Sequence, residues 1–178
     1  MENYRNDRNN LLTGSFRDRE GAEQAYNRMI DRGYRDDEIN IIMSDETRKL
    51  NFDKNKRKES EFGNKAVEGA GAGSAIGGSI GAAVGIIAAI GTSLAIPGLG
   101  IVIAGPIAAG LAGAGAGGIS GGIVGALVGA GIPEKRSKEY EKVIKEGHIV
   151  MGLRPRSDAD ANYMEENWQQ LEGEDIYQ

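Results

Sequence analysis

The sequence predicts an α+β fold, in which a ferredoxin-like βαββαβ domain carries a long glycine-zipper helical hairpin between its second and third strands. Two observations predict the domain: residues 11–44 read as strand, helix, strand, and residues 148–178 repeat that order. A third predicts the insertion, because residues 69–132 hold 21 of the 28 glycines and no charged residue. Neither half can bury its sheet alone, so we expect the halves to share one antiparallel sheet backed by two helices.

The first half of the domain, residues 11–44, follows a polar arm at residues 1–10 that we expect to be disordered. Its opening stretch, LLTGSF, is typical of a strand, and Asp18 can cap a helix that begins at Arg19. The apolar residues of this helix recur at the offsets of one helical face. They are Ala22, Ala25, Tyr26, Met29 and Ile30. Gly33 suits the left-handed position that ends a helix, and INIIMS predicts a second strand.

The highly charged residues 45–65 predict a solvated connector, and residues 133–147 predict a connecting helix with Pro133 in its first turn. The second half of the domain follows at residues 148–178. HIVMGLRP predicts its first strand, Asp158 can cap the next helix, and EDIYQ predicts the last strand. The helix carries one apolar stripe. The stripe consists of Ala161, Met164, Trp168 and Leu171.

The hairpin insertion, which we assign to residues 66–132, contains the uncharged block and predicts closely packed helices. A flexible linker would mix glycine with polar residues, whereas Ile, Val, Leu and Ala fill the gaps here. A phosphate-binding loop is disfavoured, because no GxxxxGK occurs and a charged connector precedes the block. Instead, two series of glycines recur every four residues, which follows one ridge of an α-helix and lets two backbones approach closely. The series are Gly69, Gly73, Gly77, Gly81 and Gly85, and Gly113, Gly117, Gly121, Gly125 and Gly129.

The two glycine series mirror each other about Leu99, since each glycine of one series has a counterpart at the same distance on the other side. Turn-forming residues surround this centre. They are Pro97, Gly98 and Gly100. We therefore predict an antiparallel helical hairpin with a glycine zipper along its seam. Its arms, residues 69–96 and 104–131, have 28 residues each, or roughly 42 Å as α-helices.

The hairpin predicts membrane insertion. Spanning the hydrocarbon core takes about 20 residues, so either arm is long enough. Basic clusters flank the hairpin at both ends, which places both termini and the domain on the cytoplasmic side of the cell membrane. The clusters are Lys54, Lys56, Arg57, Lys58 and Lys65, and Lys135, Arg136, Lys138 and Lys142. The lipid bilayer and further copies of the chain are thus the expected partners. The alternative is a soluble cytoplasmic assembly whose Ile and Val faces bury one another.

The composition argues against several classes of function. The formal net charge of -5 argues against a nucleic-acid partner, and the absence of Cys excludes thiolate chemistry. The only histidine, His148, starts a predicted strand, where a structural role is favoured. We find no constellation of residues able to do chemistry, so we predict no catalytic residue, cofactor or metal site and expect a chain that is not an enzyme.

Three stretches carry a resemblance to a known family: GSFRDREGAEQAYNRMIDRGYRDDEINIIMSDETRK, IPGLGIVIAGPIAAGLAGAGAGG and VGALVGAGIPEKRSKEYEKVIKEGHIVMG. Nearly all of residues 11–156 resembles bacterial general stress proteins with a heat-induced YflT-like N-terminal domain. The resemblance implies a stress-response protein at a membrane and supplies no catalytic residues. We therefore expect a non-enzymatic stress protein that is anchored in or on the membrane and self-assembles. The alternative is a soluble oligomeric module that senses a small ligand or a protein partner.

Overall fold

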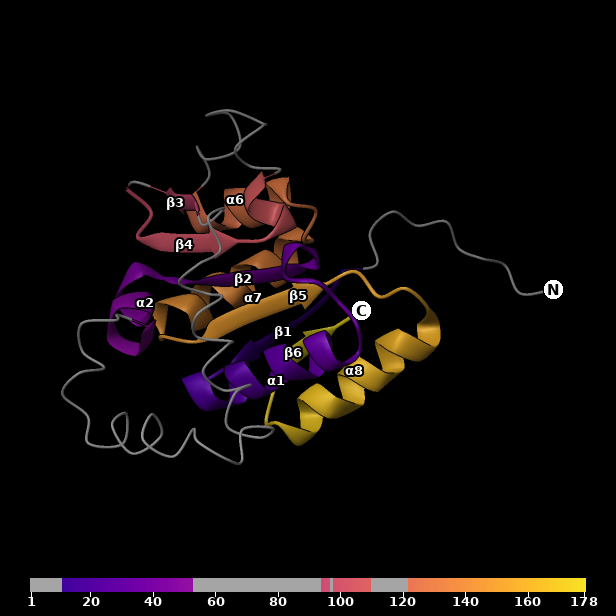
Figure 1. Ribbon diagram of the computed structural model, residues 1–178. Helices are drawn as coiled ribbons and strands as arrows, with labels where there is room; N and C mark the ends of the chain where they lie inside the picture. Colours follow the sequence, from indigo (N-terminus) through magenta and orange to yellow (C-terminus); the bar gives the residue numbers. More distant parts are fainter. Residues whose placement is uncertain (1–10, 53–93, 97, 110–121) are drawn as a thin grey trace, which may run out of the picture.

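The computed structural model describes residues 11–52, 94–96, 98–109 and 122–178, which form three layers around a central antiparallel sheet (Figure 1). The sheet has six strands in the order β3-β4-β2-β5-β1-β6. The strands are β1 (Leu12–Phe16), β2 (Ile39–Ser44), β3 (Leu94–Ile96), β4 (Ile101–Ala104), β5 (Ile149–Leu153) and β6 (Glu174–Tyr177). The predicted α+β class is confirmed.

Helices cover both faces of the sheet. α1 and α8 pack on one face, and α6 and α7 pack on the other. The helices are α1 (Arg19–Asp31), α2 (Asp45–Phe52), α6 (Gly122–Gly129), α7 (Glu134–Lys145) and α8 (Asp158–Gln170), with a 3-10 turn at Asp36–Glu38. Because β2 and β5 are buried on both sides, their sequences, INIIMS and IVMGL, read as nearly continuous apolar runs rather than as a strict alternation.

The two halves of the predicted domain pair with each other at the centre of the sheet. β1 lies antiparallel to β5, with Leu12 opposite Leu153 and Phe16 opposite Ile149. The other side of β5 pairs with β2, and the other side of β1 pairs with β6. The two halves of the domain therefore share one sheet, although the whole Gly-rich block separates them in the chain.

The core beneath α1 and α8 is built around Trp168, which is fully buried. Its ring meets Phe16 edge-on at a centroid distance of 5.7 Å. Every second residue of each strand reaches this core, because successive side chains of a strand point to opposite faces. The strands contribute Leu12, Ile41, Met43 and Met151, and the helices contribute Tyr26, Met29 and Met164. The apolar faces predicted for these two helices therefore point toward the sheet.

A second core lies between the sheet and helices α6 and α7. The strands contribute Ile42, Ile103 and Val150, and the helices contribute Leu127, Tyr140 and Ile144. The hydroxyl of Tyr140 donates to the carbonyl of Asp175 at 2.9 Å, and burial raises the pKa of Tyr140. The predicted connecting helix thus covers a face of the sheet as α7.

Side-chain caps fix the N-termini of the two helices on the first face. The Oδ1 atom of Asp18 accepts a hydrogen bond from the N–H of Gly21 at 2.8 Å, as predicted. The predicted cap of α8 is wrong by one residue. Ser157 is the cap, and its hydroxyl accepts from the N–H of Asp160 at 3.1 Å, while Asp158 is the first helical residue.

The predicted connector at residues 45–65 begins with a helix, α2, which corrects the sequence analysis. The hydroxyl of Ser44 accepts from the N–H of Thr47 at 2.9 Å, and the hydroxyl of Thr47 donates to the carbonyl of Gly147 at 3.2 Å. Phe52, at the end of the helix, is buried. The high charge of this stretch concealed a short helix with one buried stripe. The remainder of the predicted connector lies outside the described residues.

The structure also corrects the predicted helical hairpin where its arms meet. The end of the first arm and the residues after the turn form strands β3 and β4, which pair antiparallel with each other, and β4 pairs with β2. The predicted turn is confirmed at Gly98 and Gly100, with φ of 87° and 64°, while Pro97 lies outside the described residues. The β-branched residues of IVIA favour a strand, and the edge of β2 supplies its backbone partners.

The second predicted arm, residues 104–131, is not one continuous helix either. Ala104 ends β4, residues 106–109 form a short helix, and α6 covers only eight residues. α6 packs on the sheet through three buried side chains. They are Ile123, Ala126 and Leu127. Within the part of the chain that the structure describes, no helix combines the length and the apolar character that a bilayer crossing requires.

Candidate functional site

Two of the ten glycines predicted for the zipper seam, Gly125 and Gly129, lie in the described residues, and both belong to α6. The other eight lie outside the described residues. They are Gly69, Gly73, Gly77, Gly81, Gly85, Gly113, Gly117 and Gly121. The predicted contacts between the two glycine series therefore also lie outside the described residues.

Helix α6 has an inner and an outer face. Its outer face includes Gly129 and Val128, both exposed, and Val128 keeps 43% of its accessible surface. Gly125 lies one helical turn before Gly129, on the same side. A ridge without side chains beside an apolar residue lets another small-residue helix approach closely. α6 therefore offers a packing surface that the sheet does not use.

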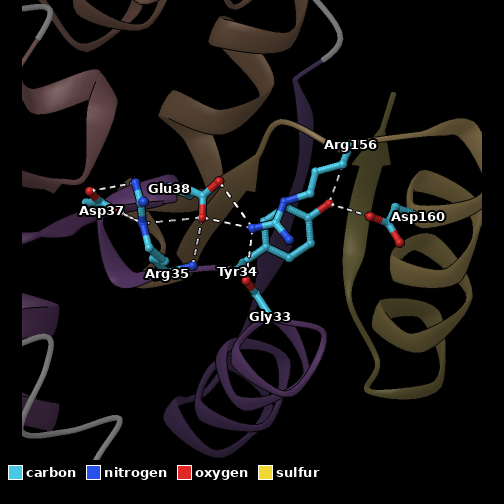
Figure 2. A network of polar contacts seen from close by, with 7 residues as sticks. All are labelled: Gly33, Tyr34, Arg35, Asp37, Glu38, Arg156 and Asp160. Carbon is cyan, nitrogen blue, oxygen red and sulfur yellow. Dashed lines mark hydrogen bonds and ion pairs between the residues drawn. The ribbon is translucent and has the colours of Figure 1, made fainter.

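A cluster of charged side chains joins the α1–β2 loop to the β5–α8 loop (Figure 2). Arg156, from the second loop, lies over the ring of Tyr34, with 4.4 Å between the guanidinium carbon and the ring centroid. The same guanidinium donates to the carbonyl of Gly33 at 2.9 Å and to the carboxylate of Glu38 at 3.1 Å. One arginine thus holds three groups of the first loop.

Asp160, in the first turn of α8, extends this cluster to α1. The hydroxyl of Tyr34 donates to Oδ2 of Asp160 at 3.1 Å and accepts from the backbone N–H of Arg156 at 3.1 Å. Arg32, which follows α1, pairs with Oδ1 of Asp160 at 2.7 Å. Its guanidinium carbon also lies 4.5 Å from the ring centroid of Tyr163. Both helices of the first face are therefore linked at this end.

Arg35 holds the acidic turn between α1 and β2. Its side chain makes two hydrogen bonds to Asp37, at 2.8 and 3.0 Å, and its backbone N–H donates to Glu38 at 2.9 Å. That backbone bond, more than any other contact, lowers the pKa of Glu38. The pKa of Asp160 is lowered chiefly by its hydrogen bond with Arg32. These carboxylates are ionised and paired at neutral pH, so the cluster links loops rather than supplying protons.

The sequence analysis did not identify this cluster, because its members lie far apart in the chain. Arg156 and Glu38 are separated by 118 positions in the chain. A local pattern carries no information about a partner that distant. The available signal was the predicted sheet topology, which places the α1–β2 and β5–α8 loops at the same end of the sheet.

Acid is expected to remove the contribution of Asp160 to stability. Its pKa in the folded chain lies below the ordinary value of 3.8, so its ionised form favours folding. That contribution is complete above the ordinary pKa and is lost as the pH falls through the lowered one. Asp160→Asn should therefore melt below the wild type near pH 7, and the difference should shrink as the pH falls below the ordinary pKa of 3.8. Thermal unfolding followed by circular dichroism across this range measures it; a constant difference would contradict the charge argument.

His148 occupies the turn between α7 and β5. Its backbone N–H donates to the carbonyl of Val143 at 2.9 Å, and its Nδ1 atom is buried without a hydrogen-bond partner among the described residues. No group of three or more His, Cys, Asp or Glu side chains within those residues is arranged to hold a metal ion. His148 therefore lies in no such group among the described residues.

Comparison with known proteins does not identify a relative of this chain. No known protein family, no curated protein and no solved structure matches the chain. The resemblance to general stress proteins therefore stays a prediction from the sequence.

Proposed function

We propose that this chain is a non-enzymatic stress-response protein that attaches to a membrane through the first part of its Gly-rich block, residues 69–93. The observation that carries the proposal is that the described residues, which do not include this segment, already cover both faces of the sheet and form two buried cores. Residues 69–93 add a stretch of 25 residues that contains no charged residue. Long apolar surfaces beyond the core of a protein mark interaction with membranes or with other proteins.

We further propose that β6, β1, β5 and β2, with α1 and α8, form a ferredoxin-like βαββαβ unit. The observed order β2-β5-β1-β6 supports this assignment. Within this unit the strands follow each other in the chain as β1, β2, β5 and β6. The first and third of them, β1 and β5, are central in the sheet, and the second and fourth, β2 and β6, lie on either side, as in a ferredoxin-like unit. The chain between β2 and β5 then contributes β3 and β4, which extend the sheet, and α6 and α7, which cover its second face.

The anchor enters and leaves the membrane on the same side. Phe52, which ends α2, and Leu94, which starts β3, belong to one folded domain, so a single crossing would pull them apart. Two crossings would leave about 12 residues for each, whereas a span takes about 20. We therefore infer a shallow, re-entrant anchor on the cytoplasmic side. The basic cluster before it is suited to anionic head groups. The cluster consists of Lys54, Lys56, Arg57, Lys58 and Lys65.

Self-association is the second part of the proposal. The outer face of α6 presents exposed Val128 and Gly129 to the surroundings. Chains gathered on a membrane surface would meet at high local concentration, which strengthens weak contacts without any new ones. Small-residue helix faces of neighbouring chains are suited to pack together there.

Fractionation of cells that make the wild-type chain tests the proposal. We expect the protein to sediment with the membranes at high speed. It should stay there through a high-salt wash and be released by detergent. High salt removes a purely electrostatic attachment, because it screens surface charges. A wild-type chain that stays in the supernatant without detergent, as a defined oligomer, would contradict the membrane anchor. That result would favour the soluble oligomeric module instead.

A charged residue in the anchor provides the variant for this experiment. Ile87→Arg should move the protein from the pellet to the soluble or aggregated fraction, since a central Arg costs up to about 2.5–3.5 kcal/mol of insertion on translocon-derived scales. Ile87→Leu is the matched control and should pellet like the wild type. A soluble assembly would also suffer from Ile87→Arg, so the behaviour of the wild type decides between the two.

A further inference from the structure

A cavity of about 400 Å³ opens at the edge of the sheet where β1 and β2 begin and β5 ends. Leu11 precedes β1, Arg154 follows β5 and Asn40 belongs to the start of β2, and all three line it. Pro106 and Ile107, just after β4, complete an apolar wall. Cavities that bind small molecules commonly enclose about 300–1,000 Å³ and combine apolar walls with a few polar groups. This cavity has both the size and the lining for a small ligand.

The apolar wall is held firmly against the sheet. Asn40 is almost completely buried, at 3% exposure. Its side-chain oxygen accepts from the N–H of Ile107 at 2.8 Å, and its side-chain nitrogen donates to the carbonyl of Gly152 at 3.2 Å. These bonds fix the segment after β4 to the two strands beside it. The cavity is therefore formed before any ligand arrives, which reduces the entropic cost of binding.

Among the described residues, the charges around the cavity leave one positive group without an ion-pair partner. Asp37 and Glu38 line the cavity, but Arg35 binds Asp37 and Arg156 binds Glu38. Arg154 also lines the cavity and makes no ion pair with another described residue, in contrast to these two arginines. The three arginines carry +3 and the two acids carry -2, so a single positive charge remains.

We propose that this cavity binds a small organic monocarboxylate. The guanidinium of Arg154 would hold the carboxylate through paired N–H donors, a geometry that arginine provides and lysine does not. A short aliphatic body would then lie against Leu11, Pro106 and Ile107. The acids Asp37 and Glu38 disfavour a doubly charged anion such as phosphate, because like charges repel at short range. The site does not depend on the membrane anchor, so either proposal can fail without the other.

Titration of the full-length chain with hexanoate, followed by NMR chemical shifts, tests this site. We expect saturable shifts at Leu11 and Ile107. Arg154→Gln should weaken hexanoate binding by at least about tenfold, as loss of charge-assisted hydrogen bonds implies. Arg28→Gln removes the same charge from an exposed position on α1 and should leave the affinity unchanged. Arg154→Lys, which keeps the charge but loses the paired donors, should fall between wild type and Arg154→Gln.

Two further probes make the result decisive. 1-Hexanol has the same apolar body without a charge, and inorganic phosphate has the charge without the body. Both should bind at least about tenfold more weakly than hexanoate if Arg154 reads the carboxylate. Equal binding of hexanol, equal binding of phosphate, or no hexanoate binding at all would each overturn the proposal. So would hexanoate binding that Arg154→Gln leaves unchanged.

Discussion

Replacing Trp168 with alanine is expected to destabilise the fold by about 3–5 kcal/mol, the range found for large aromatic residues in cores. Trp168 is fully buried and contacts Phe16 edge-on. Its ring also lies directly on the backbone of β1, since a Cβ atom at Gly14 would come within 2.9 Å of it. Removing the indole would therefore leave a cavity where α8 meets the central strand. Urea unfolding followed by circular dichroism measures the loss. Tryptophan fluorescence cannot be used for this variant, because Trp168 is the only tryptophan of the chain.

Two control variants accompany this prediction, one at Trp168 itself and one at an exposed leucine. The indole N–H of Trp168 has no hydrogen-bond partner among the described residues. Trp168→Phe removes that buried donor and keeps most of the ring, so it should cost clearly less than Trp168→Ala. Leu50→Ala, at a position with 61% exposure, should change stability by no more than about 0.5 kcal/mol. A Trp168→Ala variant as stable as Leu50→Ala would contradict the packing described here.

Replacing Gly105 with alanine is the second change with a large expected effect, about 4 kcal/mol or more. The φ angle of Gly105 is 91°, and a Cβ atom there would lie 2.1 Å from the carbonyl oxygen of Ile39. The clash involves backbone on both sides, so no side-chain rotation can relieve it. We expect β4 to move away from β2, which would weaken the second core as well.

Gly98→Ala is the matched control for this prediction. Gly98 has a similar φ angle of 87°, but no atom of the described residues lies within 4 Å of a Cβ atom built there. It should lose only the backbone preference, roughly 1–2 kcal/mol. Hydrogen exchange of the amides in β4, together with urea unfolding, distinguishes the two variants. Equal losses for Gly98→Ala and Gly105→Ala would show that the contact with Ile39 is not rigid.

The sequence predicted most elements of the sheet domain, because their signals are local. Apolar runs bounded by turn residues marked β1, β2 and β5, and helical spacing marked α1, α7 and α8. The strands of the insertion were not predicted, because the four-residue spacing of the glycines on either side favoured helix throughout the block. The edge of β2, which pairs with β4, decides the outcome there. That edge is a product of the tertiary fold and is absent from any local window.

The two candidate sites were predicted to different extents. Four-residue spacing predicted the helix that contains Gly125 and Gly129, but not that its inner face would pack on the chain's own sheet. The charged cluster around Arg156 depends on two loops brought together by the sheet. The same is true of the cavity beside Arg154, where segments from five parts of the chain converge. Residue spacing within one segment predicts the faces of a helix or strand. The charged cluster and the cavity instead form where segments distant in the sequence meet in the folded domain.

The pairing of β4 with β2 also bears on how this chain avoids aggregation. An uncovered strand edge is a template on which other chains can add strands. Without the insertion, β2 would present six residues, INIIMS, as such an edge, with the apolar face beneath α6 and α7 open beside it. The IVIA stretch of β4 is itself apolar and β-prone. Because β2 and β4 pair with each other, neither presents this strand edge to another chain. The insertion therefore protects the β2 edge of the sheet from adding strands of other chains.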